Sequence, residues 1–148
     1  MKTFILSLFV LLFMSSTSFA AGSCDITVTS NNDGIQLTLD MTADGSGDCD
    51  ACTFTARGFL YELEMNPGTA TDEYDLVLND TDDLDLLDGD GADMSNALGM
   101  TLADKYIRAL APSGNFYYFF GEELDLVGSN MGNAGTATVK IKFSRTLK

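Results

Sequence analysis

The 148-residue chain contains no histidine and no tryptophan, and its basic residues are scarce. Without histidine, the chain lacks the commonest general base and the commonest metal-binding side chain in proteins. Eight Lys and Arg residues against 22 Asp and Glu residues give a net charge of −14 at pH 7. This balance argues against binding to nucleic acid or to anionic membranes, which attract basic surfaces, and favours cations or basic partners.

Long apolar runs are also missing, apart from one at the amino terminus. The segment MKTFILSLFVLLFMSSTSFA has an early lysine, an apolar run over residues 4–14 and small residues before Ala20, which is the layout of a secretory signal peptide. The run is too short for a membrane-spanning helix, which needs about 20 residues. We therefore predict a signal peptide over 1–20, one domain over 21–148, and export to the periplasm, cell surface or exterior without a membrane span.

Three cysteines follow this segment, at Cys24, Cys49 and Cys52. An oxidising compartment favours one disulfide, either from Cys24 to one of the other two or within the CxxC pair. The acidic surroundings of Cys49 and Cys52 do not suit a redox thiol, and the chain lacks the further ligands that zinc requires. AGSC at 21–24 loosely resembles a lipidation motif, so the alternative to an ordinary secretory signal peptide is a lipoprotein with a lipid on Cys24.

Apolar and polar residues alternate along much of the chain, which predicts β-strands. The predicted strands cover residues 25–29, 35–41, 59–65, 74–78, 105–110, 115–120, 123–127 and 136–144. Turns rich in Gly, Asn and Asp separate them, and no helical periodicity lies between them. The pattern therefore predicts an all-β fold, a single antiparallel β-sandwich of the jelly-roll or immunoglobulin-like type.

Two of these strands carry specific expectations about which side chains are buried. In 59–65, Phe59, Tyr61, Leu63 and Met65 are expected on one face, with Glu62 and Glu64 opposite. The aromatic stretch NFYYFF at 115–120 is interpreted as a core strand, the alternative being an exposed interface anchor.

Several segments together resemble a group of small tailed-phage proteins. They are DGSGD at 44–48, GFLYELEMNPG at 58–68, DEYDLVLND at 72–80, DLLDGDGADMSN at 85–96 and ELDLVGSNMGNAGTATVKIKF at 123–143. Proteins of this group are virion structural proteins with no associated enzymatic activity. The resemblance implies a non-catalytic structural or surface-display role, such as a head-decoration or fibre-associated subunit, with copies of itself or other structural subunits as partners. The predicted signal peptide departs from this pattern, because capsid proteins assemble in the cytoplasm.

The stretch DTDDLDLLDGDGAD at 80–93 concentrates aspartate. Its glycines fit turns, and its acids are interpreted as a solvated face. The alternative is a calcium site, because only oxygen ligands are on offer, formed by Asp85, Asp88, Asp90 and Asp93. That alternative corresponds to a secreted module that binds calcium or carbohydrate. The spacing does not match the EF-hand pattern.

The carboxyl end is basic and carries Lys140, Lys142, Arg145 and Lys148. Lys140 and Lys142 are expected to project from one face of the last strand, which is interpreted as a charged edge strand that resists aggregation. The functional alternative is an interface, formed by Lys140, Lys142 and Arg145, that contacts the acidic 72–93 segment of a neighbouring copy. No set of residues suggests catalysis, because any of 22 acids could form a carboxyl pair and a Ser/His/Asp triad is impossible without histidine.

Overall fold

The computed structural model describes residues 21–30, 32, 34–71, 73–89, 91–94 and 118–145, except for the side chain of Tyr61. The predicted signal peptide, the predicted strand 105–110 and residues 115–117 of the aromatic stretch lie outside this part of the chain. Within it the fold is all-β, as the sequence predicts, and contains no helix.

Six antiparallel strands form one hydrogen-bonded sheet within the described residues, in the order β1-β2-β6-β3-β5-β4. The strands are β1 (Ser23–Ser30), β2 (Gly34–Thr42), β3 (Cys49–Asn66), β4 (Asp75–Asn79), β5 (Tyr118–Ser129) and β6 (Thr136–Ser144). Strands β1 and β2 form a hairpin in which Ser30 faces Ile35. The last predicted strand matches the observed one at both ends.

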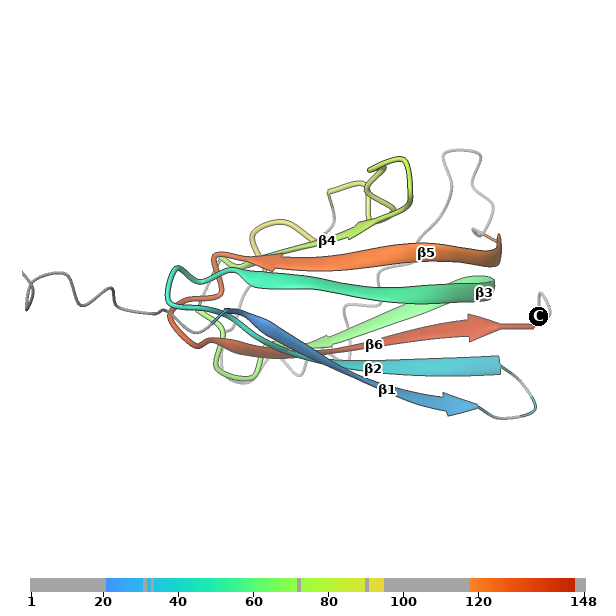
Figure 1. Cartoon of the computed structure of the whole chain (residues 1–148), viewed down its shortest axis with the longest axis horizontal. Coiled ribbons are helices and arrows are strands. Elements are labelled where there is room, and N and C mark those ends of the chain that lie inside the picture. The colour runs from blue at the N-terminus through green and yellow to red at the C-terminus, as the bar shows by residue number, and fades with distance from the viewer. Residues whose placement is uncertain are drawn as a thin grey trace, which may run out of the picture.

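The sheet becomes a sandwich because β3 turns back on itself. Its first half pairs with β5 as far as Phe59, and its second half pairs with β6 from Phe59 onward. Figure 1 shows β3 leaving the layer of β4 and β5 and returning in the layer of β6, β2 and β1. Gly58, at φ +112°, allows the corner, because a side chain there would be strained and its Cβ would lie 2.6 Å from the Ser144 carbonyl oxygen.

The core lies between the two layers, and among the described residues it consists of apolar side chains, with the Tyr74 hydroxyl as a buried polar atom. Alternate residues of β2 and β6 point into it, and their Leu39, Val139 and Ile141 are fully buried. Leu76 and Leu78 of β4, with Leu124 and Leu126 of β5, face them from the other layer. The period of two that the sequence shows in these strands therefore corresponds to a real inner face.

The face predicted for residues 59–65 is correct only in its second half. Leu63 and Met65 are buried, but Phe59 is half-buried and Leu60 takes the core position. The pairing with β6 shifts between Leu60 and Glu62, so one extra residue reverses the inward-facing set. The bulge has no signature in the local sequence.

Two other expectations about strands change with the topology. Residues 118–120, the described part of the predicted strand 115–120, belong with the predicted strand 123–127 to one long strand, β5, which has a further register shift beside Gly121. Strand β6 lies between β2 and β3, so the interpretation of the lysine-bearing strand as an edge is wrong. Among the described residues, the edge strand on that side of the sheet is β1.

Candidate functional site

Strand β1 is the most exposed element of the described structure. In this part of the chain it pairs only with β2 and stands at the end of the strand order. Seven of its eight residues are exposed, and Cys24 is the exception. One row of backbone donors and acceptors along β1 therefore has no strand beside it among the described residues, and such an edge can pair with another extended chain.

The apolar side chains of β1 lie on the core side of the sheet without being covered. Ile26 pairs with Leu39 and Val28 with Leu37, both of which are buried. Nevertheless Ile26 is 38% exposed and Val28 is 62% exposed. Figure 1 shows the reason: β1 begins close to β3 and diverges from the opposite layer toward its carboxyl end. The sequence alternation predicts the correct face for these residues but gives no sign of their exposure.

The amino-terminal end of β1, in contrast, is fastened to β3. Cys24 forms a disulfide with Cys52, which resolves the pairing that the sequence leaves open. With its sulfur in this bond, Cys24 has no thiol for a lipid. Gly22 packs so closely that a Cβ there would lie 2.9 Å from the Cα atom of Cys49. β1 is thus held at one end and exposed along the rest.

Cys49 is a free thiol buried beside this disulfide. Its single S–H proton has two acceptors within reach, the carbonyl oxygens of Ser23, 3.2 Å from Sγ, and Asp50, at 3.4 Å. Burial raises the pKa of Cys49, and the nearby charges of Asp50 and Asp44 raise it further. The thiol therefore stays protonated at neutral pH.

Three aromatic rings gather where β3 turns and β5 begins. The ring of Tyr118 lies 4.4 Å from that of Phe59 and 4.5 Å from that of Phe120, measured between centroids. Phe120 is 76% exposed, whereas Phe119 between them is buried. The expectation that this stretch is core therefore holds for Phe119 and not for its two neighbours, whose rings lie on the outer face.

The aspartates of the 80–93 stretch build turns. One carboxylate oxygen of Asp80 accepts hydrogen bonds from the backbone N–H groups of Asp82 and Leu84. The two carboxylate oxygens of Asp85 accept one bond each, from the N–H groups of Leu87 and Gly89. These carboxylates accept hydrogen bonds from backbone N–H groups that have no partner strand in an irregular loop.

Of the four predicted calcium ligands, Asp90 lies outside the described residues. Asp85 is engaged in its two hydrogen bonds, and Asp88 and Asp93 both adopt positive φ values, 50° and 52°. Among the residues that the structure describes, no group of three or more acidic or cysteine side chains is placed to hold a metal ion. Calcium binding by this stretch stays a prediction.

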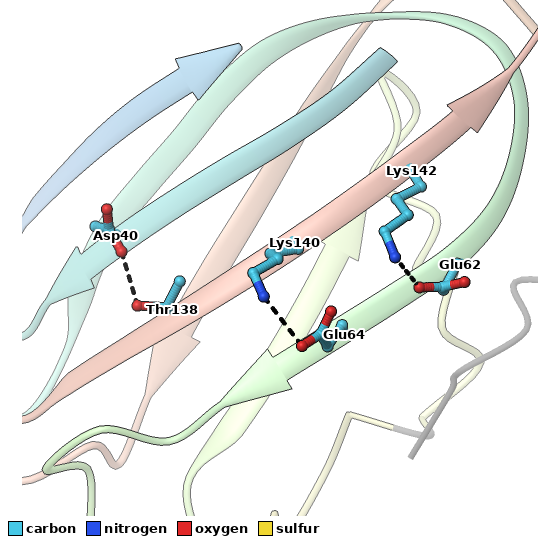
Figure 2. Close-up of polar contacts among 6 residues, drawn as sticks. All are labelled: Asp40, Glu62, Glu64, Thr138, Lys140 and Lys142. Carbon is cyan, nitrogen blue, oxygen red and sulfur yellow. Dashed lines mark hydrogen bonds and ion pairs between the residues drawn. The ribbon is translucent and has the colours of Figure 1, made fainter. Parts of the chain in front are cut away.

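The basic residues predicted as an interface are mostly paired within the chain. Lys140 forms an ion pair with Glu64 at 3.0 Å, and Lys142 forms one with Glu62. Figure 2 shows both lysines reaching from β6 to β3 on the same face of the sheet, as the alternation predicts. On the other side of β6, the Thr138 hydroxyl donates to Asp40 of β2. Arg145, at the end of the strand, is exposed.

Comparisons with protein families, with characterised proteins and with solved structures find no match for this chain. Among the described residues, no helix has the length and apolar character that crossing a membrane requires. The disulfide is consistent with a protein that folds outside the reducing cytoplasm.

Proposed function

We propose that this protein is an exported, non-catalytic structural subunit that associates with a second copy of itself through the free edge of β1. The observation that carries the proposal is the exposure of Ile26 and Val28 on an edge strand without a neighbour among the described residues. The proposal agrees with the role that the resemblance to tailed-phage virion proteins implies. It places that role at a surface outside the cell.

A second copy suits this edge because β1 is self-complementary. In an antiparallel pair centred on Thr27, Ile26 of one copy faces Val28 of the other, and the reverse. Cross-strand pairs of β-branched residues contribute about 0.2–1 kcal/mol each. Asp25, the only charged residue of β1, faces Thr29 of the other copy, so no like charges meet. The result is a twofold dimer with one continuous sheet.

The test compares two lysine substitutions that change the net charge equally. Val28→Lys places a charge in the proposed contact, while Leu84→Lys places the same charge at another exposed apolar residue, 52% exposed and outside β1. Light scattering after size-exclusion chromatography, on the chain from Ala21 onward, measures the mass. We expect a dimer for the wild type and Leu84→Lys, and a monomer for Val28→Lys.

A cysteine substitution tests the register itself. In the twofold pair, Thr27 of one copy faces Thr27 of the other, so Thr27→Cys should form an interchain disulfide under mild oxidation. Thr29 faces Asp25 of the other copy, so Thr29→Cys should not. A wild type that stays monomeric at high concentration, or a dimer that survives Val28→Lys, would overturn the proposal. Hydrogen exchange then tells whether the β1 amides of such a monomer are open to solvent or protected from within the chain.

A further inference from the structure

Three cysteines lie at the start of β1: Cys24 and Cys52 form the disulfide, and the Cys49 sulfur contacts the carbonyl oxygen of Ser23. Cys24 is bonded to Cys52, and the third cysteine, Cys49, is a free thiol. Residues three apart in a strand normally face opposite sides. Here the pairing with β5 shifts between Cys49 and Cys52, so that both side chains are buried, at 3% and 1% exposure. The bulge thus presents two cysteines of β3 to the interior beside β1.

The free thiol lies against the backbone of β1. Its Sγ is 3.2 Å from the carbonyl oxygen of Ser23, which belongs to the peptide group that leads into Cys24. The tight approach of Gly22 to the Cα atom of Cys49 holds the two segments together at the same point. Cys24 is therefore bonded to one cysteine of β3, and the peptide group that leads into it contacts the thiol of another.

We propose that Cys24, Cys49 and Cys52 form a disulfide-exchange unit, in which β1 can be fastened to β3 through either Cys52 or Cys49. In the exchange the Cys49 thiolate attacks Sγ of Cys24. The Cys24–Cys49 bond forms, the Cys24–Cys52 bond breaks, and Cys52 leaves as a thiolate that takes up the proton lost by Cys49. One disulfide and one thiol remain, so the step needs no oxidant or reductant.

The exchange moves the attachment point of the edge strand. Cys49 is the first residue of β3, whereas Cys52 lies beyond the bulge. Fastening to Cys49 draws the start of β1 toward the beginning of β3 and releases its contact farther along. The structure holds the Cys24–Cys52 form, and burial of the Cys49 thiol keeps its attack slow at neutral pH. The inference does not depend on the self-association proposed above.

Peptide mapping can separate the two forms because an aspartate lies between the cysteines. Cleavage before aspartate releases Cys24 in AGSC, Cys49 in the dipeptide DC that starts at Asp48, and Cys52 in the peptide that starts at Asp50. Mass spectrometry after acid quenching then identifies which peptide AGSC is linked to. In the protein as purified, we expect AGSC linked to the peptide that contains Cys52.

The decisive sample is the wild type equilibrated in a mixture of reduced and oxidised glutathione. We expect a new AGSC–DC species there, and its complete loss in Cys49→Ser, which should keep the Cys24–Cys52 link. In Cys52→Ser we expect all AGSC to be linked to DC. An equilibrated wild type with only the Cys24–Cys52 link would overturn the inference, and so would a folded Cys52→Ser variant with two free thiols. If Cys52→Ser does not fold, the wild-type sample alone decides.

Discussion

At the scale of single residues, aspartates of the 80–93 stretch stabilise turns by accepting backbone hydrogen bonds. The high number of aspartates in the sequence does not indicate this role. Asp85 illustrates it, since each of its carboxylate oxygens binds one backbone N–H, at 2.9 Å in both cases. Calcium would compete for the same oxygens. A solvated face and a turn-building role are compatible, because a carboxylate can accept backbone bonds and still meet water.

Substitution of Asp85 should therefore destabilise the fold even in the absence of metal. Asp85→Ala leaves two loop N–H groups without their acceptor, and we expect a loss of about 1 kcal/mol in the free energy of unfolding. Urea denaturation in the presence of a chelator measures it. Asp82→Ala, at an exposed neighbour, is the matched control and should be neutral. If Asp85→Ala also behaved as wild type in chelator, the turn-building role would be wrong.

Tyr74 presents the opposite case, a polar atom without a partner. Its side chain is fully buried, and among the described residues its hydroxyl finds no hydrogen-bond partner. Burial raises the pKa of Tyr74 to about 12. We expect Tyr74→Phe to stabilise the protein by about 1 kcal/mol at neutral pH, because a buried hydroxyl without a partner carries a desolvation cost. Thermal denaturation tests this, and a destabilised variant would point to a partner for the hydroxyl.

The same substitution should change the pH dependence of stability. The unfolded tyrosine loses its proton near pH 10, while the folded one keeps it up to about pH 12. Between these values the folded state binds more protons, so stability falls as the pH rises. Tyr74→Phe should lose stability less steeply than wild type in this range, as urea denaturation at both ends would show.

At the scale of elements, the corner of β3 determines the architecture. Gly58 and Gly121 both adopt positive φ, +112° and +104°, but only Gly58 is close to a neighbouring strand; a Cβ on Gly121 would meet nothing within 4 Å. Gly121→Ala should cost about 1 kcal/mol from backbone strain alone. Gly58→Ala should cost about 1–3 kcal/mol more, because its Cβ meets the carbonyl of Ser144. Chemical denaturation of both variants measures the difference, and equal losses would mean that the contact does not fix the corner.

The pairing of β6 with the second half of β3 includes ion pairs between side chains of the two strands. Lys140 and Glu64 form a cross-strand ion pair between side chains that are 38% and 29% exposed. Such partly exposed pairs contribute about 0–1 kcal/mol. Glu64→Lys should destabilise the protein by about 0.2–1 kcal/mol through like-charge contact, and adding Lys140→Glu should restore most of the loss. A double-mutant cycle at low and high salt measures the coupling, and its absence at low salt would contradict this assignment.

Individual strands also show how much of the fold can be predicted from the sequence. The strand 136–144 is predicted at both ends because its alternation is unbroken and its two faces meet two different environments. The corner of β3 is not predicted, because bulges reverse the inward-facing set without a local signal, as the contrast between Leu60 and Leu63 shows. Likewise the alternation assigns Ile26 and Val28 to the inner face, but their exposure depends on where the opposite layer ends, which no local pattern records.

At the scale of the whole molecule, charge and association oppose each other. Two copies with net charge −14 repel one another, whereas the proposed contact along β1 brings together apolar residues and no opposite charges. Salt screens the repulsion, since the Debye length falls from about 10 Å at 0.1 M to about 3 Å at 1 M. The alternative contact, between the basic residues near the carboxyl end and an acidic segment of a neighbour, depends on attraction that salt weakens.

The salt dependence of self-association therefore distinguishes the two modes. We expect the dimer of the wild type to become tighter as sodium chloride is raised from about 0.05 to about 0.5 M, because only the long-range repulsion is screened. Sedimentation velocity over a range of protein concentrations measures the dissociation constant. Val28→Lys, which also lowers the net repulsion, should stay monomeric throughout, so any dimer it forms would not use β1. A wild-type dimer that dissociates with salt would instead assign the interface to ionic contacts such as those predicted for Arg145, whose neighbours Lys140 and Lys142 already have partners within their own chain.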